Sequence, residues 1–116
     1  MSADRSPNLV AWQWSIYSDS HRDHANLLVH ILAVPMFWAG SAMLLYGIFT
    51  LSFARVVGGV ALLLVSLLLQ ITGHKHEKFG VPLAGPRDFA TRLLTEQFVN
   101  FPRFVATGGW WRNLVG

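Results

Sequence analysis

Two long stretches of this chain contain no charged side chain. No aspartate, glutamate, lysine or arginine occurs between Asp23 and Arg55, or between Arg55 and Lys75. Crossing the roughly 30 Å hydrocarbon core of a bilayer takes about 20 helical residues, so both stretches are candidate membrane spans. Only 13% of the residues are charged, against about a quarter in an average soluble domain. The sequence therefore predicts a small integral membrane protein.

The predicted fold is an all-α helical bundle that forms a single membrane domain over residues 1–116. Pro35 interrupts the first apolar stretch. Because proline lacks an N–H and fits best at the first position of a helix, we expect one helix to end before it and another to begin there. The expected elements are a short helix at about 23–33, a first span at 35–52 and a second span at 56–78.

The C-terminal part is expected to lie at the membrane surface. Glycines and prolines predict a loop at 79–87. The amphipathic pattern that follows predicts an interfacial helix at 88–105, which Pro102 bends or ends. The tryptophans near both ends fit the aromatic belt found at headgroup depth: Trp12, Trp14, Trp110 and Trp111.

Charge distribution predicts the orientation and excludes one class of partner. Two spans place both termini on the same side, and the C-terminal part after Gly73 has six cations against three acids. By the positive-inside tendency that side is the cytoplasm, which fits a bacterial inner membrane. The cations are dispersed and follow an apolar span, so we do not expect nucleic-acid binding. No positively charged segment leads into an apolar core at the start, and no cleavable signal peptide is expected.

Polar side chains interrupt both apolar stretches at helical spacing. On the first, Asp23, Asn26 and His30 share one helix face, and on the second Gln70, His74 and Glu77 do the same. An unpaired amide or imidazole in hydrocarbon costs on the order of 2–7 kcal/mol. We therefore expect the two polar faces to meet inside the bundle.

Two interpretations of these polar faces remain open. Asn, Gln and His can hold helices together by hydrogen bonding alone. Alternatively they form a metal site, and because the chain has no cysteine, its ligands are histidine, carboxylate or amide oxygen. Imidazole plus carboxylate, without thiolate, suits non-haem iron, zinc or manganese. The spacing does not choose among these metals.

The other histidines depend on where the first helix begins. His76 is two residues from His74, so only one of the two faces inward, and we expect His76 to be exposed. If Ser20 caps the helix, His21 and His30 lie on opposite sides and cannot share a metal. If Asp23 is the cap, His21 lies in the preceding turn and can fold back. His24 is an alternative ligand.

The pattern resembles a known membrane family. Tyr17, His21, Asn26, His30 and Pro35 read as Y-x3-H-x4-N-x3-H-x4-P. Gln70, Gly73 and His74, followed by Glu77 and Pro82, read as Q-x2-G-H with an acid and a proline downstream. These motifs resemble the family of the yeast 2-hydroxy-fatty-acid dioxygenase over roughly 14–82, and the tail resembles that of short bacterial members.

The resemblance implies an activity and a set of site residues. It implies an Fe(II)-dependent oxidation by O2 that shortens a 2-hydroxy fatty acid, or a related lipid, by one carbon. His21, His30 and His74 would be the metal ligands, and Asp23 the helix cap. Asn26, Gln70 and Glu77 would orient the ligands or the substrate.

The expected partners are the lipid bilayer, a fatty-acyl substrate and O2, and a homo-oligomer is compatible with the sequence. Lys75 or Lys78 could attract the substrate carboxylate, although lysines at a helix end commonly extend to the interface. Two other functions compete with the oxygenase. One is a non-catalytic helical subunit whose polar residues serve packing, and the other is a haem protein with two axial histidines.

Overall fold

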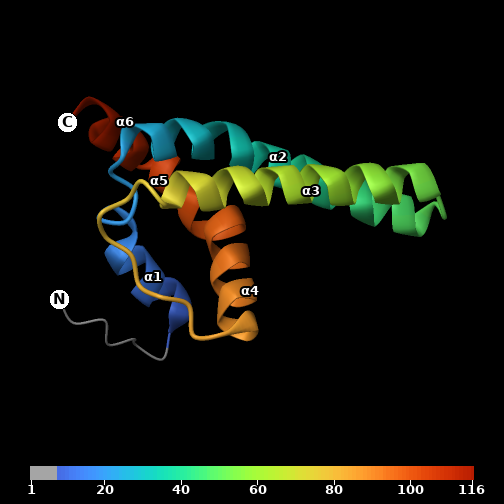
Figure 1. Cartoon of the computed structure of the whole chain (residues 1–116), viewed down its shortest axis with the longest axis horizontal. Coiled ribbons are helices and arrows are strands. Elements are labelled where there is room, and N and C mark those ends of the chain that lie inside the picture. The colour runs from blue at the N-terminus through green and yellow to red at the C-terminus, as the bar shows by residue number, and fades with distance from the viewer. Residues whose placement is uncertain (1–7) are drawn as a thin grey trace. The chain divides into compact units, whose positions relative to one another are not determined.

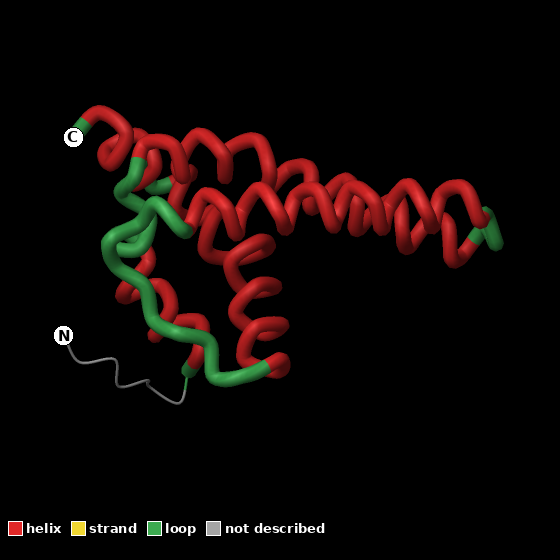
Figure 2. The backbone as a smooth tube through the Cα atoms, viewed as in Figure 1, coloured by secondary structure: helices red, strands yellow, loops and turns green. Residues whose placement is uncertain are grey.

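The computed structural model describes residues 8–116, and every regular element in that range is a helix (Figure 2). The chain divides into two compact units. One unit is a continuous segment, Ala25–His76, and the other combines residues 8–24 with Glu77–Gly116. The sequence did not indicate this division.

The continuous unit is a helical hairpin. Its helices are α2 (His24–Phe49) and α3 (Phe53–His74), which lie side by side (Figure 1). The connection is short because Leu51 adopts a left-handed conformation, with φ of 51°. Ser52 then caps α3, its side chain accepting a hydrogen bond from the Arg55 backbone N–H at 3.3 Å. The second apolar stretch is a single helix, as predicted, but it covers Phe53–His74 and not 56–78.

The predicted break at Pro35 is wrong, because α2 runs through this residue without interruption. The proline leaves the carbonyl of Ile31, four residues back, without its helical donor, and a helix tolerates this where a partner helix packs against it. Here the Ser66 hydroxyl of α3 donates to the carbonyl of Ala33, two residues before the proline. The short helix and the first span are therefore one long helix.

Glycines allow the two helices of the hairpin to pack backbone to backbone. A Cβ atom added at Gly59 would lie 2.5 Å from the backbone nitrogen of Leu44 and 2.8 Å from the carbonyl oxygen of Gly40. A Cβ at Gly47 would lie 2.7 Å from the nitrogen of Val56. Real Cβ atoms do not approach backbone this closely, so only glycine permits this helix contact, as in the small-residue interfaces of membrane helices.

Both helices of the hairpin are long and apolar enough to cross a membrane. Only 33% of the most apolar part of α2 and 22% of that of α3 is buried. The core helix of a soluble protein would be mostly covered, whereas Leu32, Leu45 and Leu68 are each more than half exposed here. The described chain thus leaves a broad apolar surface on the hairpin, as expected for helices surrounded by lipid.

The second unit packs a short N-terminal helix against the C-terminal helices. Helix α1 (Leu9–Tyr17) contacts α4 (Pro86–Thr95) and the π-helical turn η1 (Glu96–Asn100). Helices α5 (Phe101–Ala106) and α6 (Gly109–Val115) complete it. Its core contains aromatic side chains from both ends of the chain, including Trp12, Tyr17, Phe101 and Phe104. Neither α1 nor α6 was predicted from the sequence.

The predicted interfacial helix corresponds to α4, η1 and α5. These three elements form one continuous helix that contains a π turn. Within this turn, the Phe101 backbone N–H bonds to the Glu96 carbonyl five residues back. Pro102 comes next and has no N–H to donate, so the wider turn accommodates it and the helix continues to Ala106. Pro102 therefore does not end the helix.

Candidate metal centre

The helical hairpin brings His30 and His74 together. The centroids of the two rings are 4.6 Å apart and the rings are nearly perpendicular, at 86°. His30 is completely buried, and His74 is the last residue of α3. The predicted meeting of the two polar helix faces is confirmed for this pair.

The predicted amides lie in the same hairpin. Asn26 is fully buried, and its side-chain oxygen approaches Gly73 so closely that a Cβ there would collide with it. Gln70 is 2% exposed, and its amide donates to the Ser66 hydroxyl at 3.0 Å. Asn26 thus lies one helical turn before His30, and Gln70 one turn before His74. Both amides belong to the polar interior of the hairpin.

The Nδ1 atom of His30 lies 3.0 Å from the backbone carbonyl of Asn26. A carbonyl oxygen only accepts hydrogen bonds, so Nδ1 must carry the proton. In the neutral ring Nε2 then carries a lone pair. A carbonyl that fixes the tautomer in this way is the usual arrangement around a metal-binding histidine.

His21 has the same arrangement in the other unit. It lies in the turn between α1 and α2, and the helix begins only at His24, as the interpretation with Asp23 before the helix requires. Its Nδ1 lies 2.8 Å from the carbonyl of Tyr17, again four residues back. Nδ1 therefore carries the proton, and Nε2 is again left with the lone pair.

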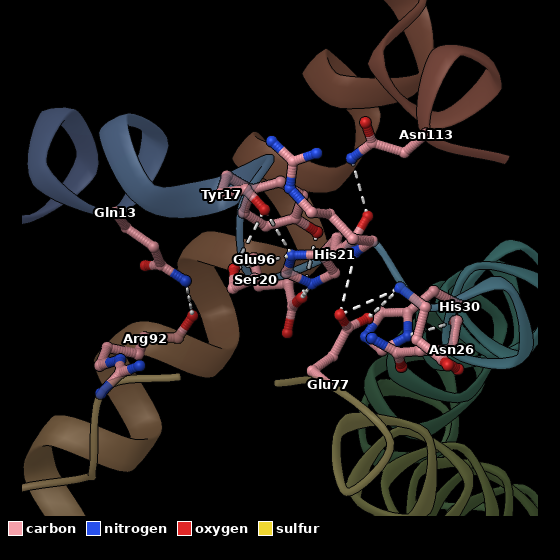
Figure 3. Close-up of polar contacts among 12 residues, drawn as sticks. Gln13, Tyr17, Ser20, His21, Asn26, His30, Glu77, Arg92, Glu96 and Asn113 are labelled. Carbon is pink, nitrogen blue, oxygen red and sulfur yellow. Dashed lines mark hydrogen bonds and ion pairs between the residues drawn. The ribbon is translucent and has the colours of Figure 1, made fainter. Parts of the chain in front are cut away.

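Glu96 lies against the Nε2 atom of His21. The distance from Nε2 to the carboxylate oxygen Oε2 is 2.7 Å, and both side chains are buried (Figure 3). The Tyr17 hydroxyl donates to the same oxygen at 3.0 Å. Burial, followed by the nearby charge of Glu96 and the hydrogen bond to it, raises the pKa of Tyr17 well above its ordinary value. The phenol therefore keeps its proton and remains a donor.

This geometry places two acceptors in contact. A neutral His21 that donates through Nδ1 presents a lone pair to a carboxylate oxygen that is also an acceptor. At 2.7 Å such a pair is repulsive unless something positive lies between or on the two atoms. Either a second proton on the ring or a metal ion bound by both meets this requirement. The arrangement is suited to a cation.

Two further side chains hold the turn that contains His21. The Glu77 carboxylate accepts hydrogen bonds from the backbone N–H groups of Arg22, at 2.9 Å, and Asp23, at 3.0 and 3.1 Å. On the other side the Asn113 amide donates to the carbonyls of Ser18, at 3.0 Å, and His21, at 2.9 Å. Figure 3 shows the Glu77 and Asn113 contacts on either side of His21. The turn is thus fixed by residues from distant parts of the sequence.

The predicted helical alignment of Glu77 with Gln70 and His74 is wrong. The helix ends at His74, so Glu77 lies in the loop that follows and belongs to the other unit. Its observed contacts orient the backbone next to His21. His24 and His76 are both exposed, as expected for His76. Among the described residues, neither joins the group that could bind a metal.

Three histidines and one glutamate of the described chain make up a group that could hold a metal ion: His21, His30, His74 and Glu96. The first three were predicted, and Glu96 was not. Its sequence position, on an amphipathic segment far beyond the two motifs, suggested a solvent-facing charge. The one signal that could have singled it out is the unbroken polar run of Thr95, Glu96 and Gln97 in that segment. Glu96 and Gln97 are both buried.

Comparisons with protein-family models, with curated proteins and with solved structures found no match to this chain.

Proposed function

We propose that this protein is a membrane metalloenzyme in which His21, His30, His74 and Glu96 bind one metal ion. The metal is Fe(II), and the reaction is the O2-dependent shortening of a 2-hydroxy fatty acid, or a related lipid, by one carbon. The reaction and the metal follow the resemblance of the sequence motifs. The metal-binding role of the residues is supported by the burial of His21, His30 and Glu96 and by the hydrogen bonds of these two histidines.

One observation carries the metal proposal. His21 and His30 come from different units, yet each donates Nδ1–H to the carbonyl four residues before it. Both rings are buried, with 2% and 0% of their surface exposed. Burial of a polar ring costs free energy unless hydrogen bonds or a metal ion pair its nitrogen atoms. The shared tautomer, with Nε2 as the lone-pair atom, is the form that binds metals.

The donor set narrows the choice of metal. Three imidazoles and one carboxylate, with no cysteine in the chain, suit Fe(II), Zn or Mn and do not suit metals that prefer all-oxygen sites. Fe(II) is the member of this group that activates O2. The protein groups would hold and orient the ion, and Tyr17 would keep Glu96 in position through its hydroxyl.

The hairpin supports a lipid substrate and a membrane location. A 2-hydroxy acid is apolar along its chain and polar at one end, and α2 and α3 present extensive exposed apolar surface. The metal-binding histidines of the hairpin lie near the ends of these helices, so a lipid could keep its acyl chain in the bilayer. The orientation we propose places both termini in the cytoplasm, following the positive-inside tendency.

Elemental analysis of anaerobically purified protein tests the metal proposal. We expect about one iron per chain in the unaltered protein. His30→Ala, His74→Ala and Glu96→Ala should each lose most of it. His76→Ala is the matched control, because this histidine is two residues from His74 and exposed, and it should keep its metal. Unaltered protein without metal, or equal loss in the control, would overturn the proposal.

A non-catalytic role in helix packing is the second candidate, and a specific contact favours it. The Gln70 amide donates to the Ser66 hydroxyl, which in turn donates to the Ala33 carbonyl across the hairpin. This chain of hydrogen bonds needs no metal. If packing is the only role of the polar residues, His30→Ala and His74→Ala will lower thermal stability, while the unaltered protein will convert no 2-hydroxy fatty acid.

A further inference from the structure

The π turn contains a buried amide that the proposed metal site does not use. Asn100, its last residue, is completely buried. Among the residues that the structure describes, neither its amide nitrogen nor its amide oxygen has a hydrogen-bond partner. Leaving a buried polar group unsatisfied costs about 1–3 kcal/mol, and native proteins have few such groups. We therefore expect a molecule that is not part of the protein to form hydrogen bonds with this amide.

The position of Asn100 along its helix indicates which side it faces. It lies four residues after Glu96 and four before Phe104, so all three share one helix face. Both flanking residues reach the same two side chains. Glu96 bonds to Tyr17 and His21, and the Phe104 ring centroid lies 5.1 Å from that of Tyr17 and 6.1 Å from that of His21. Asn100 thus lies between two residues that contact the His21 turn.

The π turn is what directs this helix face toward Tyr17 and His21. Its wider winding buries Glu96, Gln97 and Asn100 together, whereas an α-helical turn would rotate successive residues farther apart. Such turns occur frequently at functional sites. The local helix geometry and the unsatisfied amide are separate observations, and both point to a ligand at this position.

We propose that the Asn100 amide binds the polar head of the substrate, next to Glu96. This inference rests on the proposed function. A carboxamide offers both a donor and an acceptor, and a 2-hydroxy carboxylate offers acceptors on its carboxylate and both functions on its hydroxyl. The amide carries no charge, so burying it without a bound ligand costs much less free energy than burying a lysine or arginine at the same depth. Asn100 is a substrate-binding residue in this scheme and is not a metal ligand.

The test is the direct binding of 2-hydroxyhexadecanoate to the full-length protein in detergent. Binding is measured by tryptophan fluorescence or calorimetry. Asn100→Leu keeps the side-chain volume and removes both polar atoms. Because the amide has no partner in the described chain, its loss should leave the melting temperature unchanged or raise it. Metal content should also be unchanged. The dissociation constant should rise by about 10- to 100-fold, as expected for losing hydrogen bonds to a charged ligand.

Gln13→Met is the matched control. Gln13 is also a buried amide of the same unit, but it donates to the Arg92 carbonyl at 3.1 Å, one helical turn before Glu96 and away from Asn100. Its replacement should leave ligand affinity unchanged. Equal affinity in Asn100→Leu and unaltered protein would overturn the inference, as would a failure of the unaltered protein to bind the ligand. Because metal content is measured separately, a metal-loaded protein with unaltered ligand affinity in Asn100→Leu would leave the metal proposal standing.

Discussion

At the scale of single residues, the hydrogen bond made by Nδ1 determines which ring nitrogen His21 and His30 can offer to a metal ion. The Nδ1 atoms of His21 and His30 are both committed to carbonyls four residues back. That bond needs no special side chain, only a local helical turn, so nothing in the sequence marks it. The three histidines of the candidate metal group could be predicted from the motifs, but Glu96 and the ring nitrogen that each histidine offers could not.

Tyr17→Phe tests how strongly Glu96 is held. The substitution removes the hydroxyl that donates to Oε2 and keeps the buried ring. Hydrogen bonds to charged groups contribute about 1.5–3 kcal/mol, so we expect a loss of that order in the free energy of unfolding. Groups that surround metal ligands typically change metal affinity by about 10- to 100-fold, and a decrease of that size is expected here. Thermal unfolding and chelator competition measure the two effects.

The control for this prediction is Tyr46→Phe. Tyr46 is exposed on the hairpin and is far from Glu96 in sequence and in a different unit. It should leave metal affinity unchanged. If Tyr17→Phe binds metal as tightly as the unaltered protein, the hydroxyl does not position the carboxylate.

At the scale of elements, the structure differs from the sequence prediction where tertiary contacts override local rules. Pro35 should break α2 by its covalent chemistry, yet the helix continues through it, and beside it the Ser66 hydroxyl of α3 bonds to the Ala33 carbonyl. The long apolar helices could be predicted because length and hydropathy are properties of the chain itself. The π turn could not, because it depends on which carbonyl the Phe101 N–H selects.

Glu77→Ala tests the connection between the loop after α3 and the His21 turn. The substitution removes the acceptor for the backbone N–H groups of Arg22 and Asp23. We expect hydrogen exchange at these two amides to accelerate and stability to fall by about 1–3 kcal/mol. Lys78→Ala, at the exposed neighbouring position, should change neither. Unchanged exchange at both amides in Glu77→Ala would show that their hydrogen bonds to the Glu77 carboxylate are absent in solution.

Gly59→Ala tests the backbone contact in the hairpin. Its new Cβ would lie against the backbone of Leu44 and Gly40, which cannot move aside independently. Overpacking of this kind typically costs about 1–3 kcal/mol. Gly58→Ala is a closely matched control, because its Cβ would meet only the flexible end of the Met43 side chain, at 2.9 Å. Unfolding in detergent micelles should therefore separate the two variants, and equal stabilities would contradict the packing described here.

At the scale of the whole molecule, the sequence predicted a membrane protein, and the structure supplies two helices that meet the length and hydropathy requirements. The sequence did not indicate two compact units or the pairing of residues 8–24 with the C-terminal helices. That pairing depends on contacts such as Gln13 with Arg92 and Tyr17 with Glu96, which join residues far apart in the sequence. No local pattern encodes contacts at such separation.

The proposed orientation can be tested because the chain has no cysteine, so single cysteines report their own side of the membrane. Phe53→Cys lies at the start of α3, where the residue is 83% exposed, and Val115→Cys lies in α6, where it is 62% exposed. With the cations after Gly73 in the cytoplasm, the turn between α2 and α3 faces the other side. In spheroplasts, a membrane-impermeant maleimide should label Phe53→Cys directly and Val115→Cys only after lysis. Labelling of Val115→Cys alone before lysis would reverse the orientation, and labelling of both would mean that the hairpin does not span the membrane.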